Sequence, residues 1–341
     1  MSSNAPHLIL ATSPFLKRPV DTPMIMRHVI YSLVPAMLAA AWYFGLSAIM
    51  IIVATVAGAM LTEWFFKGRR PFRDSTVADG SAAVTGVLLA LTLPPSIPLW
   101  MAFLGGAIAI VFGKLIFGGL GHNIFNPSLV GRAFLQASFP VALTTWTAQR
   151  GAGGMFGLQG GNLALPLLRP DIDAITTATP LARMKFEATA TPLGDLLTGA
   201  TAGSVGETSA ILLLVGGAYL AYRKFLNWRI PLAIFVGVYA VATLLHLLDG
   251  TRPDGLFHLM SGGLMLGALF MATDPVTSPV TPLGMWVFGA GTGALVVVIR
   301  QFSGLPEGVM YAILLMNGLT PLIDRVTQPR TYGTRRHAHG A

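Results

Sequence analysis

Ser81-Ala-Ala-Val-Thr-Gly86-Val-Leu-Leu-Ala-Leu-Thr92 and Gly262-Gly-Leu-Met-Leu-Gly267-Ala-Leu-Phe-Met-Ala-Thr273 are two versions of one apolar pattern. Four further pairs match, with the second member always 186 positions after the first: Trp100 and Trp286, Gly105 and Gly291, Lys114 and Arg300, Gly118 and Gly304. Chance alignment of glycine-rich apolar segments is the alternative explanation. The constant separation favours an internal duplication, which is typical of many membrane transporters.

The composition indicates an integral membrane protein. Hydrophobic residues make up 53% of the 341 residues and charged residues only 11%, whereas a soluble domain carries about 25% charged residues. The chain has no cysteine, which excludes disulfides, thiolate metal sites and cysteine-ligated iron–sulfur clusters; no metal site is predicted. The net charge of +8 does not indicate nucleic-acid binding, because the basic residues form short clusters beside apolar segments, where they determine membrane topology.

The apolar segments predict about ten transmembrane helices, since a bilayer core about 30 Å thick needs about 20 helical residues. They lie at roughly 27–45, 47–66, 81–93, 99–118, 124–140, 207–223, 228–248, 256–273, 283–300 and 306–323. The third ends at Pro94 and Pro95 and the eighth at Asp274-Pro275, which predicts broken helices. Five spans per copy is an odd number. The predicted fold is therefore an all-α membrane protein with two inverted five-helix repeats.

The basic clusters favour a cytoplasmic N-terminus. They fall at 17–27, 67–73, 223–229 and 325–336, whereas the opposite short loops at 45–46, 93–98 and 304–306 contain no Lys or Arg. This asymmetry follows the positive-inside rule and places the long central loop outside the cytoplasm. The predicted organisation is a cytoplasmic arm (1–26), a first repeat (27–140), a periplasmic loop (141–206), a second repeat (207–323) and a cytoplasmic tail (324–341).

The central loop contains Asp171-Ile-Asp173-Ala-Ile-Thr176-Thr177-Ala178-Thr179-Pro180-Leu181. From Asp173 to Thr179 it resembles the acceptor motif of membrane flavoproteins, Asp-x-x-Ser/Thr-Gly-Ala-Thr, with Thr177 in place of the glycine. In those proteins a flavin transferase joins the FMN phosphate to the last threonine, which here is Thr179. An Asp/Thr-rich turn before a proline has a similar composition, so the motif alone leaves both interpretations open.

Longer stretches carry a more specific resemblance. They include Asp79-Gly-Ser-Ala-Ala-Val-Thr-Gly86, Gly118-Gly-Leu-Gly-His-Asn123-Ile-Phe-Asn-Pro127, Phe270-Met-Ala-Thr-Asp-Pro-Val-Thr-Ser278 and Thr327-Gln-Pro-Arg-Thr-Tyr-Gly333. Together they resemble the family that contains RnfD of the Rnf ion-translocating ferredoxin:NAD oxidoreductase and its relative NqrB of the sodium-pumping NADH:quinone reductase. The resemblance extends from about Pro6 to Gly333.

This resemblance implies a fold similar to urea transporters and an electron-transfer role in an Rnf-type complex of the bacterial inner membrane, which couples ferredoxin and NAD chemistry to Na⁺ or H⁺ movement. It implies covalent FMN on Thr179 and extends to a noncovalent riboflavin, to which no residue is assigned. The implied partners are a second periplasmic flavoprotein, iron–sulfur subunits, small membrane subunits, the flavin transferase and membrane lipid.

Polar residues near the predicted broken helices form a candidate ion path. Asp274 and Thr273 lie in the eighth span, and Asn123 and Asn126 lie at the start of the fifth. Capping of half-helices is the favoured alternative for these side chains. Other charged residues lie near predicted span ends, where snorkelling and capping are usual, and no ion role is assigned to them: Glu63, Lys114, Glu207 and Asp249.

Two other functions are compatible with this architecture. The first is a urea-like channel or transporter that carries no electrons, and the second is a non-redox scaffold subunit of the same complex. The acceptor motif in the central loop counts against the channel, because a channel has no reason to keep it; the scaffold would anchor redox partners without carrying flavin itself.

Overall fold

The computed structural model describes residues 21–67, 76–147, 157–159, 161–166, 178–187, 189, 191–199, 201–207 and 209–329. Most of the described chain is helical, and it contains no β-strand. The arm before residue 21, the tail after residue 329 and the motif residues Asp173, Thr176 and Thr177 lie outside the described residues. The prediction of an all-helical protein is confirmed.

Five described helices are long and apolar enough to cross a membrane. They are α1 (Thr22–Phe44), α2 (Leu46–Phe66), α10 (Arg229–Leu248), α13 (Pro282–Phe302) and α14 (Val309–Thr327). Three shorter apolar helices accompany them: α3 (Ser81–Leu91), α4 (Leu99–Ile110) with its π-helical continuation η3 (Val111–Leu115), and α9 (Ala210–Tyr222).

The remaining two predicted spans are shorter or more broken than the sequence pattern indicated. The segment at 124–140 contains α5 (Pro127–Ser138) and the short α6 (Pro140–Thr144). The segment at 256–273 is divided into α11 (Gly255–Met260), α12 (Leu264–Leu266) and the π-helix η5 (Gly267–Met271). Gly262 separates α11 from α12 with a φ of 66°, a left-handed conformation that glycine adopts without steric cost.

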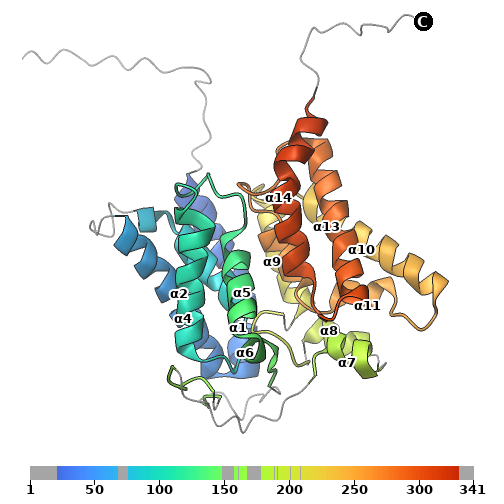
Figure 1. Cartoon of the computed structure of the whole chain (residues 1–341), viewed down its shortest axis with the longest axis horizontal. Coiled ribbons are helices and arrows are strands. Elements are labelled where there is room, and N and C mark those ends of the chain that lie inside the picture. Colours follow the sequence, from blue (N-terminus) through green and yellow to red (C-terminus); the bar gives the residue numbers. More distant parts are fainter. Residues whose placement is uncertain are drawn as a thin grey trace, which may run out of the picture.

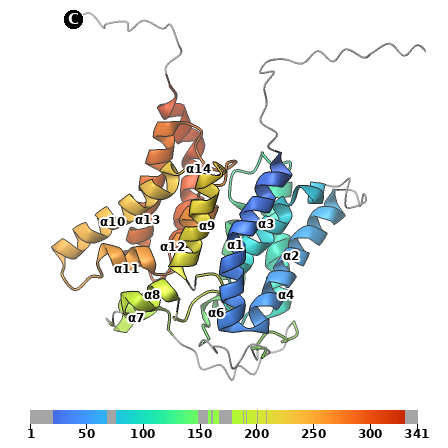
Figure 2. The same ribbon diagram turned by 180° about the vertical axis from the view of Figure 1, so that it is seen from behind.

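The helices form two halves side by side (Figures 1 and 2). Helices α1 to α6 make up one half and α9 to α14 the other, while α7 (Pro180–Glu187) and α8 (Leu193–Thr198) lie at one end of the second half. The start of α1 and the end of α14 both lie at the opposite end of the molecule, each on its own half. The loop helices and the outer ends of the first and last long helices are therefore at opposite ends.

Glycines bring the main helices of each half into close contact. A β-carbon on Gly106 of α4 would overlap the Thr55 carbonyl oxygen of α2, and one on Gly293 of α13 would lie 2.5 Å from the Ile234 carbonyl oxygen of α10. Small residues at such crossings allow helix backbones to approach in an apolar environment.

The broken helix of each half is capped by a segment that leads into the other half. At the end of α3, the Leu91 carbonyl oxygen accepts hydrogen bonds from the Gly206 amide (2.7 Å) and the Ser204 hydroxyl (3.0 Å), just before α9. At the end of η5, the Met271 carbonyl oxygen accepts one from the Asn126 side-chain amide (3.0 Å), just before α5. Carbonyl groups freed by the breaks are thereby satisfied without water.

Candidate functional site

Thr179 caps the N-terminus of α7. Its Oγ1 accepts a hydrogen bond from the Ala182 amide (3.2 Å), and its carbonyl oxygen accepts one from the Arg183 amide (2.9 Å). Pro180 occupies the first helical position, where its missing N–H is not needed. The Thr-Pro pair therefore starts this helix, and the half-buried Thr179 hydroxyl lies where the helix dipole favours negative charge.

Helix α7 is anchored to the second half by Lys185. Its ammonium group donates hydrogen bonds to the carbonyl oxygens of Arg300 (2.8 Å), Leu305 (3.1 Å) and Ser303, at the end of α13. Burial lowers the pKa of the Lys185 ammonium from its ordinary value. Lys185 lies in the last turn of α7, so this attachment fixes the short helix, with Thr179 at its start, against the second half.

A cavity of about 500 Å³ opens beside Thr179. Ala178 lines this cavity, and Thr179 lines an adjoining pocket of about 40 Å³ that shares Arg132, Trp146 and Glu307 with it. The apolar and aromatic walls of the larger cavity include Leu143, Trp146, Phe186, Met310 and Tyr311. This size and lining are typical of a site for an organic cofactor or ligand.

Arg132 of α5 is the cation that both pockets share. Its side chain is 10% exposed, and its NH1 atom lies 3.6 Å from Oε1 of Glu207. Within the described part of the chain the Arg132 guanidinium donates no hydrogen bond. Guanidinium groups have five N–H donors and bind phosphate or carboxylate strongly, so this side chain is suited to an anionic group placed in the cavity.

Two carboxylates complete the polar part of the site. Glu207 precedes α9, and Glu307 precedes α14; both line the pocket that contains Thr179. The Gly263 amide donates to Oε2 of Glu307 (3.1 Å), and NH2 of Arg300 lies 3.4 Å from Oε1 of the same carboxylate. Residues from both halves and from the central loop therefore meet in this one place.

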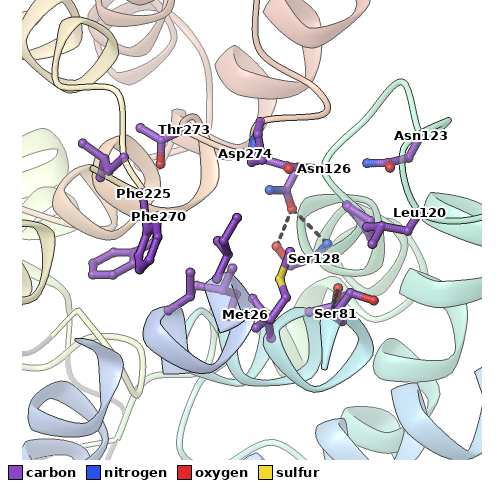
Figure 3. Close-up of a pocket in the computed structure, with 18 of the residues that line it drawn as sticks. Met26, Ser81, Leu120, Asn123, Asn126, Ser128, Phe225, Phe270, Thr273 and Asp274 are labelled. Carbon is purple, nitrogen blue, oxygen red and sulfur yellow. Dashed lines mark hydrogen bonds between the residues drawn. The ribbon is translucent and has the colours of Figure 1, made fainter. Parts of the chain in front are cut away.

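The candidate ion-path residues are also brought together, in a second pocket between the halves (Figure 3). Asn123, Asn126, Thr273 and Asp274 all line this pocket of about 90 Å³, together with apolar side chains and Lys114. It lies in a different place from Thr179, because the two sites share no lining residue.

Most polar atoms of this second pocket have local partners. Oδ1 of Asn126 accepts from the Ser128 amide (3.0 Å) and hydroxyl (2.6 Å), which caps α5. Asp274 accepts from the Val276 amide (3.2 Å), and the Thr273 hydroxyl donates to the Leu269 carbonyl (2.7 Å). The exception is Oδ1 of Asn123, which is buried and has no hydrogen-bond partner among the described residues. The capping interpretation is confirmed for Asn126.

The expectation of snorkelling was wrong for three charged residues. Glu63 and Lys114 form a buried ion pair at 2.7 Å, with side chains 0% and 3% exposed, and Lys114 also donates to the Ser81 hydroxyl (2.6 Å). Glu207 is buried against Arg132. The partners lie on different helices, so the sequence pattern near each span end could not reveal them. Asp249 does cap the end of α10 and accepts hydrogen bonds from Thr251 and Arg252.

Sequence reasoning did not identify Arg132, Glu207 or Glu307 as site residues. Arg132 lies within the predicted fifth span (124–140), and Glu307 lies at the start of the predicted tenth (306–323). Charged residues in or beside apolar segments are a functional signal. The sequence therefore contained a functional signal for these residues, but it could not show that they contact one another, because they are far apart in the chain.

Comparisons with known proteins extend these observations. The model of the NQR2, RnfD, RnfE family matches residues 9–333. Three relatives, each the component designated D of its complex, match the chain along nearly its whole length. The chain is 41% identical to that of the proton-translocating ferredoxin:NAD(+) oxidoreductase complex of Clostridium ljungdahlii, over 96% of each chain. It is 42% identical to that of the ion-translocating oxidoreductase complex of Stutzerimonas stutzeri, over 93% of each chain. It is 40% identical to that of the Na(+)-translocating ferredoxin:NAD(+) oxidoreductase complex of Acetobacterium woodii, over 98% of each chain.

Proposed function

Because this chain belongs to the NQR2, RnfD, RnfE family, we propose that it is an electron-transferring membrane subunit of an Rnf-type complex and carries covalent FMN on Thr179. The complex would couple ferredoxin and NAD redox chemistry to the translocation of Na⁺ or H⁺. The observation that carries the flavin assignment is the position of Thr179, at the head of α7 and next to a cavity of about 500 Å³.

The residues around Thr179 suit the two ends of FMN. A phosphodiester on the Thr179 oxygen would lie at the N-terminus of α7, where helix amides and the dipole stabilise negative charge. The Arg132 guanidinium, which donates no hydrogen bond within the described part of the chain, would bind the same anionic group. The aromatic walls formed by Trp146, Phe186 and Tyr311 would pack against the flat ring system.

The chemistry that FMN supplies is the exchange of one or two electrons, which can link one-electron donors to hydride chemistry. The protein's contribution is to keep the group in place and exclude water from it. A covalent tether sets its local concentration by tether length rather than by the supply of free flavin.

The two halves support a ten-span topology with inverted five-helix repeats, similar to urea transporters. Each half contains long helices and a broken helix, and each broken helix is capped from the other half. We propose that both termini are cytoplasmic, that the 141–206 loop is periplasmic and that the membrane is the bacterial inner membrane. The domain boundaries predicted from the sequence belong to the same proposal.

The partners follow from the complex. We propose association with iron–sulfur subunits, a second periplasmic flavoprotein, small membrane subunits and membrane lipid, and a transient contact between the Thr179 loop and a flavin transferase. The relatives named for protons and for Na(+) are almost equally similar to this chain, at 41% and 40% identity. Overall similarity therefore does not set the ion, and a small number of residues or another subunit must do so.

The second pocket supports an ion site as an additional proposal. Asn123 presents a buried oxygen, unpartnered among the described residues, in the same pocket as Asp274, and oxygen atoms of this kind are ligands for hard cations. Asp274→Asn and Asn123→Ala should lower ion uptake by vesicles more than electron transfer; equal effects on both would count against an ion site. Riboflavin, the second cofactor that the family implies, is proposed without assigned residues.

The test of the flavin assignment is fluorescence of the polypeptide after denaturing electrophoresis. The chain is produced with its flavin transferase, as wild type and as Thr179→Ala, Thr179→Ser, Thr176→Ala and Thr177→Ala. Thr179→Ala should abolish the fluorescence, whereas Thr179→Ser keeps a hydroxyl and the other two variants keep the acceptor. A fluorescent Thr179→Ala chain would refute the site, and a non-fluorescent wild type would favour the scaffold or channel function.

A further inference from the structure

Glu207 is a buried carboxylate in the pocket that contains Thr179. Its side chain is 7% exposed, and its Oε1 has no hydrogen-bond partner among the described residues. This oxygen lies 3.6 Å from NH1 of Arg132 and would be 2.5 Å from a β-carbon on Gly263, so it is packed against the break between α11 and α12. A carboxylate with so few donors is poorly stabilised in its charged form.

Glu307 contacts the same glycine but has a different environment. Its carboxylate accepts hydrogen bonds from the amides of Gly263 (3.1 Å) and Val309 (3.4 Å) and pairs with Arg300 (3.4 Å). Charge-assisted hydrogen bonds of this kind favour the ionised form. Glu307 is therefore a fixed negative charge, whereas Glu207 is the member of the pair that is free to change its protonation.

The charges that face Glu207 are balanced. They are Arg132 from α5, Arg300 from α13 and Glu307 from the loop before α14. With Glu207 ionised, the two carboxylates offset the two guanidinium groups. Arg300 is occupied by Glu307 and by the carbonyl oxygens of His258 (2.7 Å) and Ser261 (3.0 Å). Among the described residues, Arg132 is the cation of this group that no carbonyl oxygen occupies, so a further negative charge placed here would rely mainly on Arg132.

We propose that Glu207 is a redox-linked proton-binding site, which takes up a proton from water when an electron enters the adjoining cavity. The proposal rests on the proposed function, because it requires the flavin to occupy that cavity. The step is balanced: one electron arrives from an iron–sulfur donor or a chemical reductant, and one proton forms an O–H bond on the Glu207 carboxylate. No other bond forms or breaks, and the total charge of the site is unchanged.

The ionisation properties of the pair support this role. Burial, together with the neighbouring charge of Glu307, raises the pKa of Glu207 to about 7, although Arg132, the Ser204 side chain and Arg300 oppose the rise. Burial acts in the same direction on Glu307, but Arg300 and Arg132 and the amides of Gly263 and Val309 outweigh it and hold the pKa of Glu307 below its ordinary value. A group that titrates near neutrality responds to a small change in local charge.

A purely structural ion pair between Glu207 and Arg132 is the competing role. In that case Glu207 stays ionised in both redox states, and its replacement alters folding or assembly but not the response of the flavin to pH. Two measurements therefore distinguish the two roles: the pH dependence of the flavin midpoint potential, and the infrared absorption of the Glu207 carboxyl group on reduction.

The experiment uses the purified complex with its flavin and measures the midpoint potential of the Thr179 flavin over a pH range that brackets neutrality. Wild type, Glu207→Gln and Glu187→Gln are compared, since Glu187 is an exposed carboxylate on α7 that pairs with Arg183. The wild-type potential should fall with rising pH more steeply near the pKa of Glu207 than the potential of the Glu207→Gln variant. Glu187→Gln should reproduce the wild-type curve.

Infrared difference spectra of the wild-type complex, reduced minus oxidised, detect the protonation directly. A carboxylic acid C=O band that shifts in heavy water should appear on reduction. Its loss in Glu207→Gln would assign the band to Glu207. Coincident potential curves for wild type and Glu207→Gln, or a wild-type spectrum without this band, would overturn the proposal. In either case covalent flavin on the gel would still confirm the flavin assignment, whereas its absence would refute the proposed function itself.

Discussion

At the scale of single residues, Thr179 combines two roles that depend on the same oxygen atom. As the N-cap of α7, Thr179 Oγ1 accepts a hydrogen bond from the Ala182 amide. As the proposed flavin attachment site, the same oxygen forms a phosphoester. The two roles are compatible, because a cap uses an oxygen lone pair while ester formation replaces the hydroxyl proton. The same position also places the proposed phosphate next to Arg132.

Replacing Thr179 by Asn separates these roles. Asn is a good N-cap but has no hydroxyl, so we expect Thr179→Asn to assemble without covalent flavin, whereas Thr179→Ala also destabilises α7 by about 1 kcal/mol. Ferredoxin-linked NAD reduction and ion uptake by vesicles should collapse in both variants. Near-normal turnover in a flavin-free variant would show that Thr179 is not needed for electron flow, and loss of ion uptake alone would place the flavin in the coupling step.

Glu207 predicts a pH-dependent stability. The pKa of Glu207 is about 7 in the folded protein, against an ordinary value of 4.5. Between these two values the folded state therefore binds more protons than the unfolded state. The contribution of Glu207 to the unfolding free energy is fully present below pH 4.5 and is lost as the pH rises through 7. The shift corresponds to a free energy on the order of 3 kcal/mol. Thermal unfolding of the detergent-solubilised wild type should therefore occur at lower temperature at pH 8 than at pH 6, with a smaller difference in Glu207→Gln. Equal pH dependence in both proteins would show that Glu207 is ionised throughout.

At the scale of helices, α2 and α4 are joined by glycine contacts and by a buried ion pair. Lys114 lies in the π-helical continuation of α4, where its ammonium group reaches both Glu63 oxygens (2.8 and 2.7 Å) and the Ser81 hydroxyl of α3. A buried pair of this kind is neutral overall, but it leaves a costly unpaired charge when one partner is removed. It therefore fixes the relative position of three helices.

Breaking this pair should destabilise the first half. Glu63→Gln leaves the Lys114 ammonium buried without a counter-charge, for which we expect a loss of about 3–5 kcal/mol in unfolding free energy. The double variant Glu63→Leu, Lys114→Met should lose much less unfolding free energy, because it leaves no buried charge without a partner. Thermal unfolding of the solubilised protein measures the loss of stability in the single and the double variant. Glu187→Gln is the control, because it removes an exposed ion pair that contributes about 0.3–0.5 kcal/mol to the unfolding free energy. A Glu63→Gln protein as stable as wild type would show that the pair has no structural role.

At the scale of the whole molecule, the candidate flavin site exists only where the two halves and the central loop meet. Arg132 comes from the first half, Glu207 and Glu307 from the second, and Thr179 from the loop. The second pocket likewise combines α3 and α5 with η5. Under the proposed function, a movement of one half relative to the other would alter both pockets together and would couple redox chemistry to ion movement.

Reporter fusions test the proposed membrane orientation. The basic residues predict that alkaline phosphatase fused near Gly161 is active, because the proposed orientation places the central loop in the periplasm. Fusions near Lys224 and Arg336 should be inactive, because the same orientation places both positions in the cytoplasm. The reverse pattern would overturn the orientation and with it the periplasmic location of the flavin.

The sequence by itself determined the helical membrane class, the family and the identity of Thr179 as the candidate acceptor. These depend on local properties: apolar segments of bilayer length, the short motif around Thr179 and long stretches shared with relatives. It also predicted that Asn126 acts as a helix cap, because capping is a local interaction. The breaks at Thr92 and Asp274 were visible for the same reason, since a proline that directly follows an apolar helical segment disfavours continuation of the helix.

The tertiary structure alone decided which charged side chains are buried and which partners they have. Glu63 meets Lys114, and Arg132 meets Glu207, across 51 and 75 positions of sequence. The free energy of a charged group depends on the atoms that surround it in space, not on its distance from the end of an apolar segment. For that reason the sequence pointed to Thr179 as the candidate flavin acceptor, whereas the cavity and the carboxylate pair beside it emerged only when the two halves were packed together.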